Sequence, residues 1–272
     1  MTAPPFDWGP LLKGGPLFIG ILNLTPDSFS DGGRFMDPDA ALAQALDLLQ
    51  SGARMLDLGA ESTRPGSASV DATTERARLE AVLPVLAESL PGIPISLDTR
   101  HADVAAWGLA GGASVINDVT GFSDPDMLAL AQTSTCGLIA MRSRRQGRGF
   151  HMPPYDDPTP KSAEAAIAEL GAIRNRLHRA DIRDGRVLLD PGFGFGTTYL
   201  EDLALWESLP GLPQFLAWPV ERICIGISRK RFLAVRAGAP DLPPPRRDGL
   251  TGAAQEEASH LGYRVFRMHA IG

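Results

Sequence analysis

Short apolar runs and longer amphipathic stretches alternate along nearly the whole chain, and this alternation constrains the fold more than any other feature. The runs have the length and β-branched content of buried strands, and the stretches between them have the length of helices. We count eight strands, with seven helical segments between them. The strands read LFIGILNL (17–24), MLDLGA (55–60), PISLDT (94–99), SVINDV (114–119), GLIAM (137–141), VLLDPG (187–192), ICIGIS (223–228) and VFRMHA (265–270).

Strands that alternate with helices form parallel sheets, because a helix carries the chain back to the start of the next strand. Two helices have clear starts, at Pro38 and at Thr73. An open doubly wound sheet usually has fewer strands and a G-x-G-x-x-G segment after the first, which this chain lacks. The sequence therefore predicts an α/β fold, a TIM-type (β/α)8 barrel that spans residues 1–272 as a single domain. The eighth outer helix is apparently missing, because only two residues follow the eighth strand.

Composition and charge narrow the range of functions. A formal charge of −6 and a pI near 5.4 argue against a nucleic-acid or anionic-membrane partner, since both require a basic surface. The sequence has neither a signal peptide nor an apolar run long enough to span a bilayer, so we expect a cytoplasmic protein. Cys136 and Cys224 each lie in an apolar run and are expected to be buried, reduced thiols. A small-molecule substrate is favoured.

Two segments rich in Arg, Gly and Pro have no periodicity. Residues 142–158 are expected to form a long loop after the fifth strand, and residues 237–249 a second loop before the last helix. Both are interpreted first as solvated connections. A lid over the active site is the alternative.

Polar side chains gather at the carboxyl ends of the predicted strands, where a barrel of this type carries its active site. They are Asn23, Glu61 to Arg64, Asp98, Asn117, Asp118, Asp190, Ser228 to Lys230, Arg267 and His269. Burying several of them at the mouth is unfavourable unless a ligand satisfies them. The sequence lacks H-E-x-x-H, a nucleophile elbow and a Cys-rich pattern, so covalent or zinc catalysis is disfavoured. Carboxylates and amides on one side and cations on the other suit a polar heterocycle joined to an anionic leaving group.

Seven segments together resemble the signatures of the dihydropteroate synthase family of pterin-binding enzymes. They are GILNLTPDSFSDGG (20–33), LDLGAESTRPG (56–66), SLDT (96–99), INDVTG (116–121), LLDPGFGFG (188–196), ISRK (227–230) and RMH (267–269). The resemblance runs from about Leu17 to His269. It implies a transferase of folate biosynthesis, a target of sulfonamides, that condenses 6-hydroxymethyl-7,8-dihydropterin pyrophosphate with p-aminobenzoate.

The resemblance also implies a role for each matching residue. Asn23 would bind the Mg²⁺ that accompanies the pyrophosphate, and Arg267 and His269 would bind the pyrophosphate itself. The pterin would be bound by Asp98, Asn117, Asp190 and Lys230, and the p-aminobenzoate site would be shaped by Thr63, Arg64 and Ser228, with Met141 also contacting substrate. The catalytic residues would be Asp98, Lys230 and Arg267. Pyrophosphate would leave first, and Asp98 would stabilise the resulting cation before the neutral amine attacks.

The chain departs from the family pattern at several positions. Thr197 and Ala270 replace a usual lysine and aspartate, Ala140 replaces a usual histidine, and Arg231 replaces a usual serine beside the presumed p-aminobenzoate pocket. These changes bear on affinity and sulfonamide response more than on the reaction class. The family typically dimerises through its final helices, so the missing last helix predicts a weakened homodimer.

Two alternative functions stay open at this stage. One is a paralogue that binds pterin with little or no turnover, as a partner or regulatory subunit. The other is a pterin-dependent methyltransferase that serves a corrinoid, although the ESTRPG and SRK segments argue against it.

Overall fold

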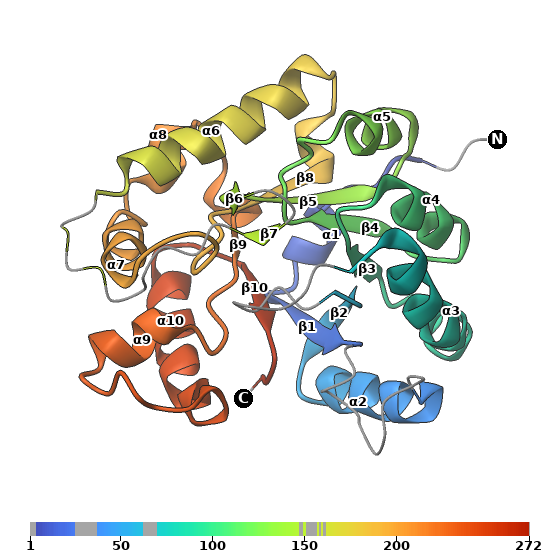
Figure 1. Cartoon of the computed structure of the whole chain (residues 1–272), viewed down its shortest axis with the longest axis horizontal. Coiled ribbons are helices and arrows are strands. Elements are labelled where there is room, and N and C mark those ends of the chain that lie inside the picture. Colours follow the sequence, from blue (N-terminus) through green and yellow to red (C-terminus); the bar gives the residue numbers. More distant parts are fainter. Residues whose placement is uncertain are drawn as a thin grey trace.

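Eight parallel strands form the centre of the molecule in the computed structural model (Figure 1). The structure describes residues 4–24, 37–61, 70–146, 149–150, 157, 159 and 162–271. The barrel strands are β1 (Leu17–Asn23), β2 (Ala53–Gly59), β3 (Ile95–Asp98), β4 (Val115–Asp118), β5 (Gly137–Met141), β8 (Val187–Asp190), β9 (Cys224–Ile225) and β10 (Val265–Met268). Their order in the sheet is β8-β5-β4-β3-β2-β1-β10-β9, and a parallel bridge between Leu189 and Ile223 joins its two edges. The predicted (β/α)8 barrel is confirmed.

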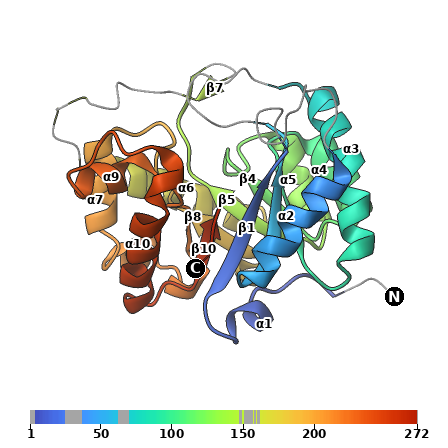
Figure 2. The same ribbon diagram turned by 90° about the horizontal axis from the view of Figure 1, so that it is seen from below.

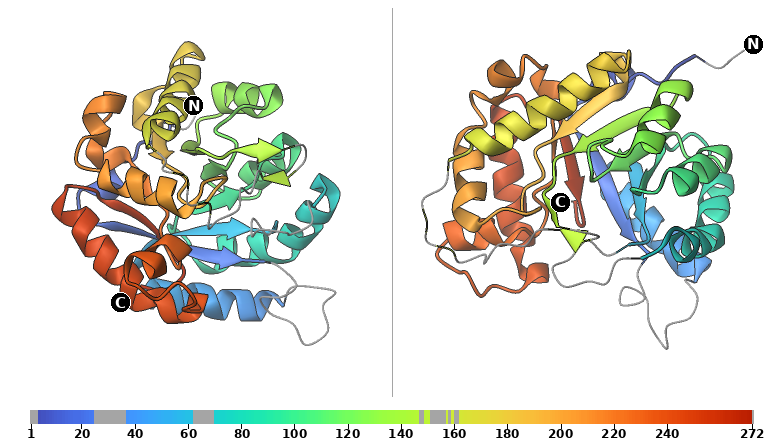
Figure 3. Two further views of the ribbon diagram at one scale, coloured as in Figure 1. Left: turned by 60° about the vertical axis from the view of Figure 1, so that its left-hand side comes forward. Right: turned by 45° about the horizontal axis from the view of Figure 1, so that its top comes forward.

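Helices surround the strands on the outside, as the two views of Figure 3 show. They are α2 (Pro38–Gln50), α3 (Ala72–Ser89), α4 (Ala102–Ala110), α5 (Pro125–Thr133), α6 (Glu164–Arg179), α7 (Tyr199–Glu207), α8 (Leu212–Leu216), α9 (Arg231–Arg236) and α10 (Asp248–His260), with short 3₁₀ helices at Asp184–Arg186, Val220–Arg222 and Pro244–Arg247. Helix α2 begins at Pro38 as predicted, after Asp37, whose side chain accepts a hydrogen bond from the Asp39 N–H. The seven predicted connections are present, and the last two are each divided into two helices.

The barrel interior is filled by apolar side chains from most of the barrel strands. These inward residues are Leu17, Ile19, Met55, Val115, Ile139, Leu188, Cys224 and Val265. Trp8, next to the short helix α1 (Gly9–Leu12), packs against them and is fully buried, and its indole N–H donates to the Arg186 carbonyl at 2.8 Å. Helix α1 lies at the opposite end of the barrel from β7 (Figure 2), so this segment, which the sequence did not predict, covers the floor.

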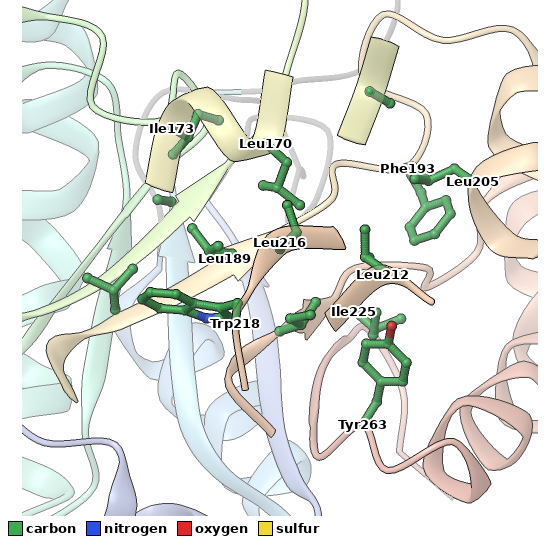
Figure 4. Close-up of a cluster of buried hydrophobic side chains, with 14 of the residues drawn as sticks. Leu170, Ile173, Leu189, Phe193, Leu205, Leu212, Leu216, Trp218, Ile225 and Tyr263 are labelled. Carbon is green, nitrogen blue, oxygen red and sulfur yellow. The ribbon is translucent and has the colours of Figure 1, made fainter. Parts of the chain in front are cut away.

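A second apolar layer lies between the strands and the helices. Figure 4 shows part of it, where Leu189 and Ile225 of the strands face Leu170 and Ile173 of α6 and Leu212 and Leu216 of α8. The hydroxyl of Tyr263 is accommodated there because it donates to the Leu209 carbonyl at 2.8 Å. This layer fixes the outer helices on the barrel and therefore fixes the strand ends relative to one another.

The loops and the chain end differ in detail from the expectations. The predicted loop after the fifth strand contains a short antiparallel hairpin, β6 (Arg145–Gln146) with β7 (Gly149–Phe150), and the second loop contains the Pro244–Arg247 turn of 3₁₀ helix. In the described part of the chain no helix follows β10, and this end lies between α10 and α2 (Figures 1 and 3). Cys136 and Cys224 are free and buried, as expected. None of the described helices is long and apolar enough to cross a membrane.

Candidate active site

The polar residues of the site follow the apolar interior by a simple rule. Val115, Leu188 and Val265 fill the barrel, and the residues two positions later are Asn117, Asp190 and Arg267. Since side chains alternate between the faces of a strand, a residue two positions on points into the same interior. The inward-facing residues are therefore apolar deep in the barrel and polar at its mouth, the carboxyl end of the strands.

Arg267 lies at the centre of this mouth and joins two carboxylates. Its Nε donates to Asp57 Oδ2, and its Nη2 donates to Asp98 Oδ2 at 2.5 Å. Asn117 Nδ2 donates to the same Asp57 oxygen at 3.0 Å. The Asp57 side chain is fully buried, whereas the Asp98 and Arg267 side chains keep 12% and 15% of their surface exposed. The guanidinium is thus held rigidly from below, and its remaining N–H groups and the exposed side of Asp98 are available at the mouth.

Asp57 is not among the site residues predicted from the sequence. It lies inside the strand β2 rather than at its end, two positions after the inward-facing Met55. A charged residue within an otherwise apolar run was the available signal, because a buried carboxylate requires a charged or hydrogen-bonded partner.

Two acceptor oxygens at the mouth are not satisfied by the protein that the structure describes. Asn117 Oδ1 and Asp57 Oδ1 are both buried and have no hydrogen-bond partner there. An unsatisfied buried acceptor costs about 1 to 3 kcal/mol, so such atoms point to a ligand or an ordered water that donates to them.

Asp190 and the segment that follows it form one wall of the site. Asp190 Oδ1 accepts from the Gly192 N–H at 2.7 Å, and Arg142 donates to the Pro191 carbonyl from Nε at 2.7 Å and to the Gly192 carbonyl from Nη2 at 2.8 Å. Arg142 is almost fully buried, so it acts as an internal clamp on this turn. A Cβ atom at Gly226 would lie 3.0 Å from Asp190 Oδ2, and the glycine therefore leaves room for that carboxylate.

A small apolar cluster of Val119, Met141 and Phe195 lies beside these polar groups. Lys230 Nζ lies 4.0 Å from the centroid of the Phe195 ring, a cation–π contact. The cluster offers a flat apolar surface next to an ammonium and a carboxylate, which suits a planar, polar heterocycle.

Burial changes the acid–base properties of three of these groups. It raises the pKa of Asp98 to about 7, although the positive charge of Arg267 opposes the shift, and the neighbouring carboxylate of Asp57 adds to it. Burial also raises the pKa of Asp190. It lowers the pKa of Lys230 to about 8, against the opposing effects of Asp202 and Asp190.

The remaining predicted residues are distributed around the same end of the barrel. The His269 N–H donates to Ser228 Oγ at 3.0 Å, and His269 Nδ1 lies 2.9 Å from that hydroxyl, so Ser228 fixes the imidazole. Asn23 is half-buried at the end of β1, in the inward series of Leu17 and Ile19. Thr63 and Arg64 lie outside the described residues.

The positions that depart from the family pattern are not equivalent in space. Ala140 faces outward and is buried in the layer between β5 and the helices, away from the mouth. Ala270 is exposed, and Arg231 is half-buried at the start of α9. Thr197 is buried, and its hydroxyl donates to Asp202 at 2.7 Å, beside the wall formed by residues 190–196.

Comparison with known proteins gives one consistent answer. The family model described as "Pterin binding enzyme" matches residues 19–269. Among curated proteins, the dihydropteroate synthase of Mycobacterium leprae is 37% identical over 93% of this chain and 88% of its own length, and that of Neisseria meningitidis serogroup C is 38% identical over 94% and 88%.

Solved structures agree with the sequence comparison. The dihydropteroate synthase of Xanthomonas albilineans with 4-aminobenzoic acid has a TM-score of 0.79 at 33% identity, covering 95% of this chain and 89% of its own. That of Burkholderia cenocepacia complexed with 7,8-dihydropteroate has a TM-score of 0.78 at 32% identity, covering 95% and 88%. This chain therefore belongs to the pterin-binding enzyme family, and the relatives it resembles there are dihydropteroate synthases.

Proposed function

We propose that this chain is a dihydropteroate synthase, a transferase that joins 6-hydroxymethyl-7,8-dihydropterin pyrophosphate to p-aminobenzoate and releases pyrophosphate. The observation that carries the proposal is the arrangement around Arg267, in which one guanidinium bridges Asp57 and Asp98 next to the unsatisfied Asn117 Oδ1. The relatives from X. albilineans and B. cenocepacia, described with 4-aminobenzoic acid and with 7,8-dihydropteroate, support the choice of substrates.

The pterin is assigned to the polar wall and the apolar cluster beside it. Asn117 Oδ1 and Asp190 are acceptors for the amino and ring N–H groups of a pterin, and the Lys230 ammonium is a donor to its ring acceptors. The ring would lie against Met141 and Phe195. The buried Asn117 Oδ1 would then have a partner, which is the physical reason for a heterocycle with donors and acceptors at its edge.

The reaction requires charge stabilisation rather than a strong base. The bond between the exocyclic carbon and the pyrophosphate oxygen breaks, the electron pair leaves with pyrophosphate, and the ring shares the resulting positive charge. An ionised Asp98 at the mouth stabilises that cation, and Arg267 and His269 bind the departing anion. The amine of p-aminobenzoate is neutral near pH 7, attacks the carbon and then loses a proton, so correct placement is the main requirement.

Magnesium is part of the proposal, with Asn23 as its protein ligand. The side-chain amide of Asn23 is half-buried in the inward series of β1, and its oxygen is a hard ligand of the kind Mg²⁺ takes. No group of three or more His, Cys, Asp or Glu side chains in the described part of the chain is arranged for a metal, which fits an ion that shares its ligands with substrate phosphates and water. Bound there, Mg²⁺ would neutralise charge on the pyrophosphate.

The test is pyrophosphate release by the purified protein, given the pterin pyrophosphate with and without p-aminobenzoate and with and without Mg²⁺. We expect release coupled to dihydropteroate formation, dependence on Mg²⁺, and a loss of at least about 100-fold in kcat for Asp98→Asn. Asp103→Asn, an exposed aspartate on α4, is the matched control and should keep full activity.

Binding of the pterin pyrophosphate without any release would instead support the non-catalytic paralogue. Methyl transfer to a corrinoid with no condensation would support the methyltransferase. The weakened homodimer, the cytoplasmic location and the roles of Thr63 and Arg64 stay predictions, and light scattering at micromolar concentration tests the first of them.

A further inference from the structure

Asp202 is a fully buried carboxylate that the reaction described above does not use. It lies in the first turn of α7, and its Oδ1 accepts from the Gly194 N–H at 2.9 Å and from the Thr197 hydroxyl at 2.7 Å. Its Oδ2 is buried and has no hydrogen-bond partner in the described part of the protein. An acidic residue in the first turn stabilises a helix through the helix dipole, and it does so at the protein surface as well. This effect therefore does not explain why Asp202 is buried.

The turn that is hydrogen-bonded to Asp202 lies against the side chain of Lys230. Gly194 has a φ of +75°, and a Cβ atom there would lie 3.3 Å from Lys230 Cδ and 3.5 Å from Lys230 Nζ. The next residue, Phe195, provides the ring over which Nζ lies at 4.0 Å. The turn that Asp202 holds is therefore the surface on which the lysine side chain rests.

The charges that face Lys230 come from four elements. Asp202 of α7, Asp190 of β8 and Asp98 of β3 favour its charged form, and Arg267 of β10 disfavours it. Among the three carboxylates Asp202 has the largest effect on the pKa of Lys230, which burial lowers to about 8. Burial raises the pKa of Asp202 itself to about 6, against the opposing hydrogen bonds from Thr197 and Gly194 and the charges of Lys230 and Arg142.

We propose that Asp202 is a positioning residue of the pterin site, which holds residues 193–197 under Lys230 and supplies the negative charge that keeps the Lys230 ammonium protonated. Thr197 contributes to the same arrangement, because its hydroxyl donates a hydrogen bond to the Asp202 carboxylate. Without this charge the pKa of Lys230 would fall toward neutrality, and a larger fraction of the lysine would be unprotonated and unable to donate to a ring acceptor. The catalytic consequence rests on the proposed synthase function, whereas the effect on Lys230 does not.

The chain is well suited to a direct test, because its only lysines are Lys13, Lys161 and Lys230. Protein labelled with ¹³C at the lysine Cε would give three signals, and Lys230→Arg assigns the one of interest. We expect the titration midpoint of Lys230 to fall by about 1 pH unit in Asp202→Asn, which keeps an acceptor but loses the charge. Glu207→Gln, an exposed neighbour on the same helix, should leave the midpoint unchanged. An unchanged midpoint in Asp202→Asn overturns the proposal.

A second measurement uses the unmodified protein and so does not depend on whether the variant folds. The amide proton of Gly194 should change its chemical shift with a midpoint near the Asp202 pKa of about 6, since this N–H donates to that carboxylate. A shift that is flat between about pH 5 and 8 contradicts the assignment of the turn to Asp202.

The kinetic consequence is measured separately. In the active enzyme the basic limb of kcat/KM for the pterin substrate should move to lower pH in Asp202→Asn, by the same amount as the Lys230 midpoint. A loss of kcat/KM that is equal at every pH, with the limb in place, would make Asp202 purely structural and overturns the proposal. If the unmodified protein has no synthase activity, the proposed function fails, and the two NMR measurements still test the role of Asp202.

Discussion

Arg267 illustrates how the protein can fix a side chain of the site before any substrate binds. Its guanidinium is bound from the interior by the fully buried Asp57 and from the mouth by Asp98. A free arginine side chain has many rotamers, and fixing it in advance lowers the entropy lost when an anion binds. Asp57 therefore prepares Arg267 for a pyrophosphate that Asp57 itself does not reach.

Replacing Asp57 should affect both folding and binding. In Asp57→Asn the buried guanidinium loses one of its two charged partners, and we expect the free energy of unfolding to fall by about 2 kcal/mol. The Kd for the pterin pyrophosphate should rise at least about tenfold, because Arg267 is less constrained. Urea unfolding and equilibrium binding measure the two effects. The exposed Asp47→Asn on α2 is the control, and an Asp57 variant that matches it would refute the positioning role.

Asp98 gives the activity and the stability opposite dependences on pH. Its pKa is raised by burial from 3.8 to about 7, so the folded protein binds a proton that the unfolded chain releases between these values. The contribution of Asp98 to stability is therefore present at low pH and is lost as pH rises from about 4 through 7. Ionised Asp98 is the active form, so kcat/KM should fall as pH drops below about 7.

The stability half is checked by urea unfolding of the unmodified protein and of Asp98→Asn at several pH values between about 4 and 8. The unmodified protein should lose stability relative to the variant as pH rises. A difference that stays constant with pH would mean that the pKa of Asp98 is not raised.

The sequence predicted those site residues that lie at strand ends, and it did so for a physical reason. Asp98, Asn117 and Asp190 stand at or next to the ends of β3, β4 and β8, where the apolar run stops, so their positions alone mark the mouth. Asp57, Arg142 and Asp202 carry no such mark, because the first lies within a strand, the second opens an Arg-rich segment and the third resembles an ordinary acidic residue in a first helical turn. Their importance comes from tertiary contacts that span the chain.

At the scale of elements, the segment from Asp190 to Thr197 is held by three side chains, one of which is its own Asp190. Arg142 binds its carbonyl groups at Pro191 and Gly192, Asp190 binds the Gly192 N–H, and Asp202 binds the Gly194 N–H. These directed hydrogen bonds restrict the conformations that the segment can adopt before a ligand binds. The pterin wall is therefore expected to be preformed.

Gly192 tests this close fit. It has a φ of +67°, and a Cβ atom there would lie only 1.8 Å from the Arg142 carbonyl oxygen. Gly192→Ala must displace backbone, so we expect a loss of more than about 3 kcal/mol of stability or an insoluble protein. Gly238 has a similar φ of +72° with no atom within 4 Å of such a Cβ, and Gly238→Ala should cost only about 1 to 2 kcal/mol. Equal losses in thermal unfolding would show that the close approach is not important.

The strands were easier to predict than their ends or the loops between them. The ICIGIS run predicted a strand over residues 223–228, whereas β9 is confined to Cys224–Ile225. Gly226 and Ser228 leave the ladder to make room for Asp190 and to hold His269, which local propensity does not encode. The β6–β7 hairpin was missed because its segment shows no apolar alternation.

At the scale of the whole molecule, the barrel is closed unevenly. Strands β1 and β2 pair over six register positions, whereas β8 meets the segment before β9 through the single bridge between Leu189 and Ile223. Local opening is easiest where the fewest backbone hydrogen bonds must break. The junction between β8 and the segment before β9, which we call the seam, is therefore expected to open more easily than the rest of the sheet.

Native-state hydrogen exchange should reveal this seam. The backbone amides of Cys224 and Ile225 should exchange at least about tenfold faster than those of Leu56 and Leu58 in β2, because opening at β9 costs less than global unfolding. Uniform protection across the strands would show that the outer layer around Tyr263 closes the seam as firmly as backbone pairing does.

The pairing of β1 with β10 has a consequence for how the enzyme comes into being. The bond between Arg267 and Asp57 joins residues 210 positions apart. Neither the closed ring of strands nor the anion site can therefore form until nearly the entire chain has left the ribosome. A contact between such distant residues forms late in folding, and the earlier strands stay incompletely paired until the last strand is added. The last strand therefore completes the barrel and the active site in the same step. A nascent chain, or one truncated before β10, should have no partial activity.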